Sequence, residues 1–278
     1  MAIPIINDWQ KYFTNPHEGL GSSYERIVLN QLLLRLQNKG IFSSVLETPC
    51  FGFTGISGIN LVALAQAGCE VFLEDSDPMR INMIEEVWRE LGYPMQIRFN
   101  TDFSKLDYPD RSLDFGFNFS AMWFVSDLPA FIREFTRVIR HQILICVPNR
   151  NGLGFQEQLK GYSPQLYPDL KPGFIDPASI IFQMKKCGWK LVDRNYIDCP
   201  PWPDIGMSKE DFIKGKTGLD LRSQAPDAPA NLISILDYYK GKDPEFARNM
   251  MMLYPFERLA PKWFKSFWAH HQYLLFSP

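Results

Sequence analysis

The sequence predicts an α/β fold with a mostly parallel sheet, and two observations carry this prediction. Between residues 44 and 147, short apolar segments alternate with segments that repeat apolar residues at helical spacing. Such alternation is typical of βαβ units, in which helices connect parallel strands. Acidic residues and a glycine-containing loop follow the first strands. Because ligands of parallel sheets bind beyond the carboxyl ends of the strands, these loops are where we expect the functional site.

The elements follow in a regular order. Residues 20–40 carry an apolar stripe at helical spacing, and Gly40 can end this helix. Strands are predicted at 44–47, 70–74, 96–99, 113–119 and 143–147, and helices at 56–67, 77–91 and 128–139. Pro78 suits the first turn of the second of these connecting helices.

The second half of the chain has a weaker pattern. Residues 150–175 and 199–230 are rich in turn-forming residues such as proline, which suits a cover better than a sheet. Between them, Asp176 can cap a further helix, and a strand is predicted at 189–192. The apolar segment 272–276 is a last strand, which brings the predicted sheet to seven strands.

The composition is that of an ordinary globular protein. Hydrophobic residues make up 46% of the 278 residues, which is enough for a core. A net charge of −2 argues against a general nucleic-acid binder. The five cysteines form no CxxC pair, so no metal site is expected and the thiols should be reduced. The chain starts without the pattern of a signal peptide and contains no membrane-spanning apolar run. We expect a cytoplasmic protein without stable membrane insertion.

The first motif with chemical meaning runs from Val45 to Gly58. It combines a strand, an acid, a loop with three glycines and a predicted helix. Glycines let a backbone approach a ligand closely, and the free N–H groups at a helix start can bind a carboxylate or phosphate. The same pattern also suits a βα turn without any ligand.

Two further motifs follow the next strands. In the segment from Leu73 to Met79, Asp75 suits the hydroxyl groups of a ribose, and Asp77 suits the cap of the following helix. Further on, Asp102 could accept a hydrogen bond from an adenine amino group, beside an apolar edge offered by Phe103. In isolation, Asp102 would be interpreted as a solvated loop residue, and Asp114 as structural.

Together, these motifs resemble the class I S-adenosylmethionine-dependent methyltransferases, in particular the small-molecule branch with the ubiquinone/menaquinone-type enzymes. The resemblance covers residues 43–150, and the motifs occur in the order of the family. The segment Arg137–Arg140, with the sequence RVIR, matches the end of the helix after the fourth strand. The resemblance implies a Rossmann-like, seven-stranded, mostly parallel sheet with a C-terminal antiparallel hairpin and an inserted lid.

The chain departs from the family pattern at several positions. Pro49, Phe51 and Phe53 stand where an acid-x-Gly-x-Gly-x-Gly loop would have its glycines, so this loop should follow a different path. His141 replaces the Pro-Gly turn before the fifth strand. The sequence Asn118–Ala121 differs from the Asn-Pro-Pro-Tyr type of tetrapeptide found in DNA and protein amide methylases.

The resemblance assigns site residues and three parts of the chain. Residues 1–42 would form an N-terminal lid, 43–150 the cofactor-binding core, and 151–278 the rest of the sheet with an acceptor-binding cover. The residues implied for S-adenosylmethionine are Glu47, Pro49, Gly52, Phe53, Gly55, Asp75, Ser76, Asp102, Phe103 and Asn118. Those implied for the acceptor are Tyr24, Met122, Trp123 and Trp202.

The implied reaction needs little chemistry from the protein, because the sulfonium methyl group is already activated and alignment dominates. A base is needed only for an acceptor that arrives protonated. Of the four histidines, His17 in the lid is the candidate, although a histidine is more often structural or solvated. His141 is expected to be structural. Of the neighbours His270 and His271, at most one should point inward.

The acceptor itself stays open. Aromatic residues make up 14% of the chain, which fits a small hydrophobic or aromatic acceptor better than a highly charged one. One alternative is a catalytically degenerate methyltransferase fold that serves as a binding or regulatory subunit. A nicotinamide-dependent oxidoreductase is a further alternative, since its sheet and ribose acid would look alike. The sequence leaves the methylated atom, the oligomeric state and the pathway undecided.

Overall fold

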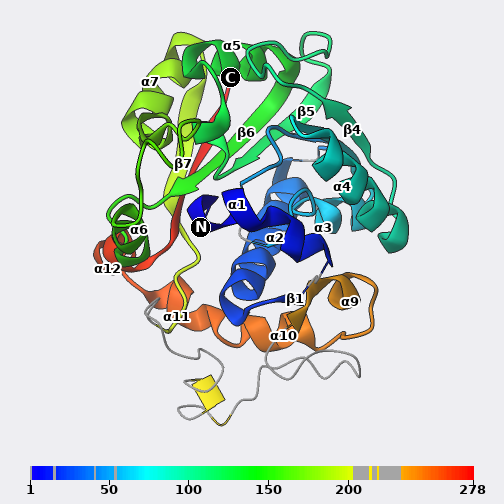
Figure 1. Ribbon diagram of the computed structural model, residues 1–278, viewed down its shortest axis with the longest axis vertical. Helices are drawn as coiled ribbons and strands as arrows, with labels where there is room; N and C mark the ends of the chain where they lie inside the picture. The colour runs from blue at the N-terminus through cyan, green and yellow to red at the C-terminus, as the bar shows by residue number, and fades with distance from the viewer. Residues whose placement is uncertain are drawn as a thin grey trace.

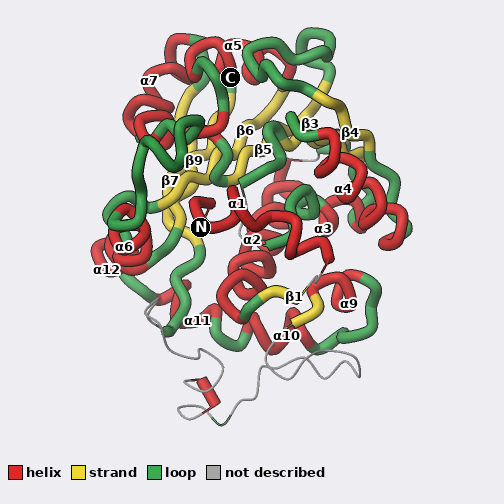
Figure 2. The backbone as a smooth tube through the Cα atoms, in the orientation of Figure 1, coloured by secondary structure: helices red, strands yellow, loops and turns green. Residues whose placement is uncertain are grey.

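A computed structural model describes residues 2–14, 17–40, 42–52, 55–202, 213–214, 218 and 233–278. Its main feature is a seven-stranded sheet with helices on both faces (Figures 1 and 2), as predicted. The strand order is β4-β3-β2-β5-β6-β9-β7. The strands are β2 (Ser44–Glu47), β3 (Glu70–Asp75), β4 (Gln96–Phe99), β5 (Leu113–Phe119), β6 (Ile139–Pro148), β7 (Lys190–Ile197) and β9 (His271–Ser277).

Only β9 runs against the other strands of this sheet. The strands β2 to β6 pair in parallel, and β9 pairs antiparallel with both β6 and β7. The expected final antiparallel pair is therefore present. Its two strands are joined by residues 198–270, a long connection that carries most of the C-terminal helices.

Helices flank the sheet on both faces, and further helices lie beyond one of its ends (Figure 1). They are α1 (Ala2–Thr14), α2 (Leu20–Gly40), α3 (Val62–Gln66), α4 (Pro78–Leu91), α5 (Leu128–Val138), α6 (Leu153–Leu159), α7 (Pro177–Lys186), α9 (Ile235–Tyr239), α10 (Phe246–Met251), α11 (Tyr254–Leu259) and α12 (Lys262–Trp268). Two 3₁₀ turns, η1 (Met122–Phe124) and η2 (Pro172–Ile175), and the small pair β1 (His17–Glu18) and β8 (Ile233–Ser234) complete the described elements.

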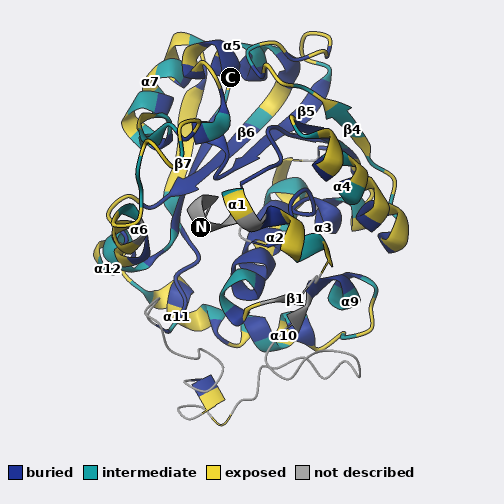
Figure 3. Cartoon of the chain, viewed as in Figure 1, coloured by how far each residue is buried: buried dark blue, intermediate teal, exposed yellow. Residues whose placement is uncertain are grey.

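Alternating strand residues supply two separate hydrophobic layers. Val45 packs with the layer of α2, α3 and α4, whereas its neighbour Leu46 packs with the layer of α5 and α7. On β6, Leu144 and Ile145 divide in the same way. All seven residues of β5 are buried, as expected for a central strand of a doubly covered sheet. Figure 3 shows this burial along the centre of the sheet.

Two helix starts follow the local signals in the sequence. The Asp77 carboxylate accepts hydrogen bonds from the backbone N–H groups of Met79 and Arg80 at the start of α4. Asp176 accepts one from the Ser179 N–H at the start of α7. In both helices, proline follows the cap. These caps satisfy N–H groups that the helix leaves without a partner.

The helix predicted at 56–67 is wrong at its start, because α3 begins only at Val62. Gly55 and Gly58 have φ values of 126° and 74°, which a right-handed helix cannot contain. A Cβ on Gly58 would lie 2.7 Å from the Ile84 side chain, so α4 packs directly on this turn. The Trp88 indole donates a hydrogen bond to the Gly58 carbonyl at 2.8 Å.

No helix among the described residues combines the length and the apolar character that crossing a membrane requires.

Gly52 lies where the loops after β2 and β5 touch. A Cβ at this position would stand 2.6 Å from the Ser120 carbonyl oxygen and 2.7 Å from that of Phe119. Backbone atoms cannot yield as a flexible side chain does. The two loops therefore approach each other as closely as they do because residue 52 has no side chain.

We predict that Gly52→Ala lowers the free energy of unfolding by ~1–3 kcal/mol through overpacking. Gly173→Ala is the matched control, since a Cβ there meets no atom within 4 Å. It should leave stability unchanged or raise it slightly. Urea unfolding of both variants measures the difference. Equal stabilities would show that the two loops can separate without cost.

Candidate functional site

A cavity of about 500 Å³ lies at the carboxyl ends of β2, β3 and β4. Its walls come from the loops after these strands, from the loop after β5, from α1 and from residues 166–171. The residues from the strand ends, the loops after them and the first turn of α4 are Pro49, Phe51, Asp75, Ser76, Arg80, Thr101, Phe103, Phe124 and Ser126. Four of the cofactor residues implied by the sequence line it, namely Pro49, Asp75, Ser76 and Phe103.

The Asp75 carboxylate is already engaged by protein groups. Arg80 donates to both carboxylate oxygens, from Nε at 2.7 Å and from Nη2 at 2.5 Å. The backbone N–H of Asp77 donates to Oδ1 at 2.9 Å. Asp75 is fully buried and Arg80 nearly so. A ribose hydroxyl that binds Asp75 must therefore share or replace one of these donors.

Arg80 connects the cavity to the N-terminal helix. Its guanidinium lies 3.8 Å from the ring centre of Phe51 and 5.1 Å from that of Trp9 on α1. Such cation–π contacts add to the ion pair with Asp75. Arg80 is not among the site residues predicted from the sequence. Its position in the first turn of the helix after the acidic strand end is the signal that could have identified it.

Glu47 lies beneath the cavity in a buried polar chain. The Asn60 amide donates to its Oε1 at 2.6 Å, and Arg26 donates to Asn60 Oδ1 at 3.0 Å. Burial raises the pKa of Glu47 to about 8, although the Asn60 hydrogen bond and Arg26 oppose this shift. Its Oε2 has no hydrogen-bond partner among the described residues. Glu47 is thus mostly protonated at neutral pH and connects β2 to α2.

Asn118 shapes the loop after β2 from the neighbouring strand. Its amide donates to the Thr48 carbonyl at 2.7 Å, and the Thr48 hydroxyl donates to Glu74 at 2.9 Å. The Thr48–Pro49 peptide bond is cis. Burial raises the pKa of Glu74 to about 7, against the hydrogen bonds from Thr48 and Asn100. Asn118 is buried behind the loop and does not line the cavity.

Asp102 and Phe103 are neighbours in the chain but differ in burial and in whether they line the cavity. Phe103 is 4% exposed and forms part of the wall. Asp102 is exposed, accepts from the Ser104 N–H at 3.1 Å and lies 3.4 Å from the Ser126 hydroxyl. The hydrogen bonds with Ser104 lower the pKa of Asp102. An adenine contact by Asp102 therefore needs a side-chain rotation or a ligand that extends beyond the cavity wall.

The four acceptor candidates fall into two hydrophobic layers. Tyr24 and Trp202 meet edge to face at 5.5 Å in one layer, and the Tyr24 hydroxyl donates to Glu257 at 2.9 Å. Met122 and Trp123 are buried in the other layer, where the Trp123 indole donates to the Ser120 carbonyl. All four are fully buried, whereas the next residue, Phe124, reaches the cavity.

Three further positions are described in part or not at all. Phe53 lies outside the described residues. His17 pairs through its backbone with Ser234, while its side chain is outside the described part. Gly55 forms a turn with positive φ and does not line the cavity. Asp114 is structural, as expected, because it accepts from the backbone N–H of Ser43.

The expectation that only one of His270 and His271 points inward is wrong. Their side chains are 11% and 2% exposed, and each lies against a buried carboxylate. Alternation holds only within a strand, and His270 lies in the bend before β9. His141 is half exposed and lies 3.7 Å from Asp114.

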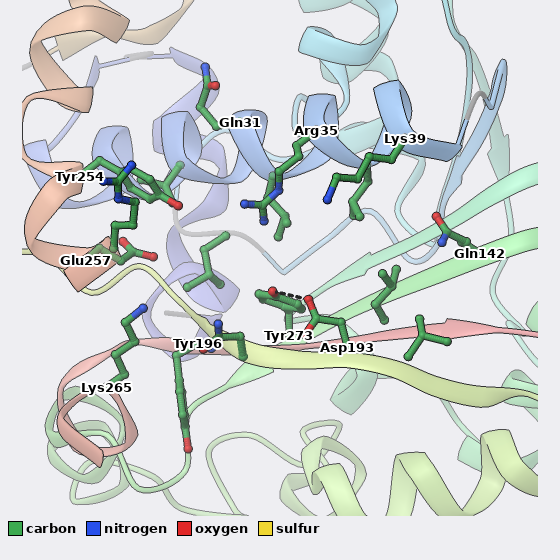
Figure 4. Close-up of a pocket in the computed structure, with 18 of the residues that line it drawn as sticks. Gln31, Arg35, Lys39, Gln142, Asp193, Tyr196, Tyr254, Glu257, Lys265 and Tyr273 are labelled. Carbon is green, nitrogen blue, oxygen red and sulfur yellow. Dashed lines mark hydrogen bonds between the residues drawn. The ribbon is translucent and has the colours of Figure 1, made fainter. Parts of the chain in front are cut away.

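A second, larger cavity of about 800 Å³ lies along the sheet between α2 and the strands β7 and β9. Figure 4 shows Arg35 and Lys39 pointing from α2 toward these strands, where the Tyr273 hydroxyl donates to Asp193. Glu257 closes one end of this cavity. It contains no residue from the loops after β2 to β5, so it is separate from the first cavity.

Sequence comparison matches part of the chain. A family model described as a methyltransferase domain matches residues 53–146, which is less than half of the 278 residues. A search of curated proteins gives no match.

Solved structures match the whole fold at low sequence identity. A putative methyltransferase in complex with the Haloferax volcanii Trm112 methyltransferase activator shares 13% identity, with a TM-score of 0.54, over 100% of this chain and 97% of that chain. A putative methyltransferase from Bacillus halodurans shares 10% identity, with a TM-score of 0.51, over 88% and 97%. The [4+2]-cyclase SpnF shares 11% identity, with a TM-score of 0.50, over 89% and 80%. The chain therefore has the Rossmann-like fold of class I methyltransferases.

The raised pKa of Glu47 gives a prediction about stability. The folded protein holds a proton on Glu47 up to about pH 8, whereas the unfolded chain releases it near pH 4.3. Between these values the folded state binds more protons, so wild-type stability falls as pH rises. Glu47→Gln removes this dependence of stability on pH. Between pH 5 and pH 8, the unfolding free energy of the variant should therefore rise relative to that of the wild type.

Denaturant unfolding at several pH values measures this difference. Glu70→Gln is the control, because Glu70 starts β3 and is exposed. Its unfolding free energy should stay at a constant offset from wild type. A constant offset for Glu47→Gln as well would mean that Glu47 is ionised in the folded protein.

Proposed function

We propose that the chain is an S-adenosylmethionine-dependent methyltransferase that acts on a small, hydrophobic or aromatic acceptor. The observation that carries this proposal is the 500 Å³ cavity at the carboxyl ends of β2, β3 and β4. It lies in a sheet of methyltransferase fold, and most of its loop residues belong to the segment matched by the methyltransferase domain.

The walls of the cavity suit a nucleoside with an amino-acid tail. A volume of about 500 Å³ lies in the range of small-molecule sites. The rings of Phe51, Phe103 and Phe124 offer apolar faces for a base, and Ser76 and Thr101 offer hydroxyl groups. We assign the adenine to the Phe103 end and the ribose to Asp75 and Ser76. The loop from Glu47 to Gly55, with Gly52 and Phe53, would hold the methionine part.

S-adenosylmethionine supplies an activated methyl group, so the protein acts mainly by alignment. Aromatic rings form part of the cavity walls, and α1 contributes Ile6 and Asn7 to the lining, while Trp9 on α1 lies against Arg80 of α4. In this proposal residues 1–42 serve as a lid, and His17 removes a proton from an acceptor that arrives protonated. Residues 151–278 complete the sheet and cover the acceptor.

We assign the acceptor to the region between α2, the loop after β5 and Trp202. Tyr24 and Trp202 belong to one hydrophobic layer, and Met122 and Trp123 belong to the other. Because these side chains are buried, they would set the shape of an apolar pocket rather than supply charge.

The fold alone does not decide the chemistry, because a single fold hosts many functions. The neighbour SpnF, described as a [4+2]-cyclase, makes this concrete. Calorimetry with S-adenosylmethionine and with NAD separates the candidates. Binding of S-adenosylmethionine supports the proposal. If the chain binds neither ligand, a regulatory or binding subunit is supported. Binding of NAD alone would support an oxidoreductase.

A substitution that fills the cavity tests the site directly. Ser76 is exposed and lines the cavity, so Ser76→Trp adds a large ring without removing a buried contact. We predict that it weakens S-adenosylmethionine binding at least about tenfold, a change of ~1.4 kcal/mol. Calorimetry with the purified variant measures the dissociation constant.

Ser112→Trp is the matched control for this variant. Ser112 precedes β5 at the opposite, amino edge of the sheet and lines a separate hollow. Its substitution should leave the dissociation constant unchanged. Wild-type affinity in folded Ser76→Trp would place the cofactor outside this cavity.

A further inference from the structure

A second buried polar cluster lies at the β7–β9 end of the sheet. Glu25 comes from α2, Asp198 follows β7, and His271 begins β9. The three residues are 1–4% exposed. One potential ligand atom from each lies within 4.8 Å of the other two. Three elements far apart in the sequence thus bring two carboxylates and one imidazole together inside the protein.

Protein contacts leave part of this cluster unsatisfied. Asp198 Oδ1 and His271 Nε2 are buried without a hydrogen-bond partner among the described residues. Glu25 Oε1 and His271 Nδ1 lie at ion-pair distance from each other, so the open positions of the cluster are Asp198 Oδ1 and His271 Nε2. Buried polar atoms are nearly always hydrogen-bonded, and two neighbouring carboxylates repel each other. A cation would satisfy both requirements at once.

The surroundings hold one of these ligands in place. His270 Nδ1 lies 2.5 Å from Asp198 Oδ2, and the His270 N–H donates to the Asp198 carbonyl at 2.9 Å. Asp198 also adopts a left-handed backbone conformation, with φ of 62°. These contacts occupy Oδ2 and leave Oδ1 for the cluster. Carboxylates that ligate a metal are themselves hydrogen-bonded by neighbouring groups, as Asp198 is here.

We infer that Glu25, Asp198 and His271 bind one divalent transition-metal ion. Carboxylate oxygen and imidazole nitrogen together suit Zn²⁺, Fe²⁺ or Mn²⁺, whereas an imidazole disfavours Mg²⁺ and Ca²⁺. Ligands about 2.0–2.2 Å from a zinc ion lie roughly 3–4 Å from each other. The observed limit of 4.8 Å permits this geometry after a small contraction. Sequence patterns did not indicate this site, because its ligands follow no short motif.

We place the entry route of the ion at the cavity of Figure 4, whose lining comes within one residue of Asp198. Ile197 and Glu257 line this cavity, and Asp198 is the next residue after Ile197. Glu257 accepts a hydrogen bond from the Cys199 N–H, so its side chain stands beside the segment that carries Asp198. An entry path of this kind is a requirement for a metal site.

The inference does not depend on methyl transfer, and its test needs no acceptor. The full chain is stripped with a chelator, dialysed, and titrated with ZnCl₂ and with MnCl₂ by calorimetry. Retained metal is measured by elemental analysis after gel filtration. Mn²⁺ is included because the chain has five thiols, which could hold Zn²⁺ elsewhere. We expect about one ion per chain and a dissociation constant below roughly 10 μM.

A bound ion should also raise the thermal midpoint, because it connects α2 to β7 and β9 and binds only the folded chain. Glu25→Gln and Asp198→Asn keep the side-chain shape and remove a ligand charge. Each should weaken binding by at least about tenfold and abolish the thermal shift. His141→Gln is the matched control, since His141 is half exposed beside Asp114, away from the cluster.

Two results would overturn the inference. The first is wild-type protein that binds neither ion and melts at the same temperature with and without it. The second is undiminished binding in both ligand variants. If these variants do not fold, the wild-type titration and melting curves decide alone. If either overturning result is obtained, the cluster is a set of buried ion pairs between α2 and the sheet.

Discussion

Buried hydrogen bonds around the end of β2 hold the carboxyl edge of the sheet in one arrangement. Asn118 on β5 donates a hydrogen bond to the Thr48 carbonyl, and the Thr48 hydroxyl donates one to Glu74 on β3. Below them, Arg26 and Asn60 connect α2 to Glu47. In this low-dielectric environment an unmade hydrogen bond is costly. The loop after β2 therefore has few alternative paths, and the cavity takes its shape from that loop.

The Asp75–Arg80 pair determines what can enter the cavity. A buried ion pair is strongly destabilised when one partner is lost, because the other charge stays buried. A ligand that displaces Arg80 from Asp75 must therefore offer the guanidinium a new partner. The carboxylate of an amino-acid ligand is such a partner, and the Phe51 and Trp9 rings already contact the guanidinium. Entry of a ligand and the position of α1 are thus coupled through one side chain.

Local signals in the sequence were sufficient to locate the seven strands of the main sheet and two helix caps, although β6 and β7 extend further than predicted. Asp77 could be identified as a cap because the interaction involves neighbours in the chain. The start of α3 could not, since the conformation of Gly58 depends on Ile84 in the next helix. The residues of the candidate site were likewise predicted only in part. Pro49 and Phe103 line the cavity, as their positions after strands suggested.

Contacts between distant segments explain the remaining differences. The sequence identified Asp75 as an acidic candidate of the site. It did not indicate that Arg80 would form an ion pair with this carboxylate, because that contact depends on how α4 is rotated on the sheet. It likewise showed two neighbouring histidines. Their carboxylate partners, Asp198 and Glu25, come from far away in the chain. Short-range patterns do not encode such pairs, so they become visible only in the folded structure.

The loop after β5 joins the two polar centres of the molecule. Ser120 has a positive φ of 52°, its carbonyl accepts from Trp123, and its backbone faces Gly52 beside the cavity. On the other side, the ring of Phe119 lies 4.7 Å from that of His271. A strained backbone persists only where its surroundings fix it from several sides. In the proposed function, an acceptor that binds against this loop would lie between the cavity at β2 to β4 and the cluster at β9.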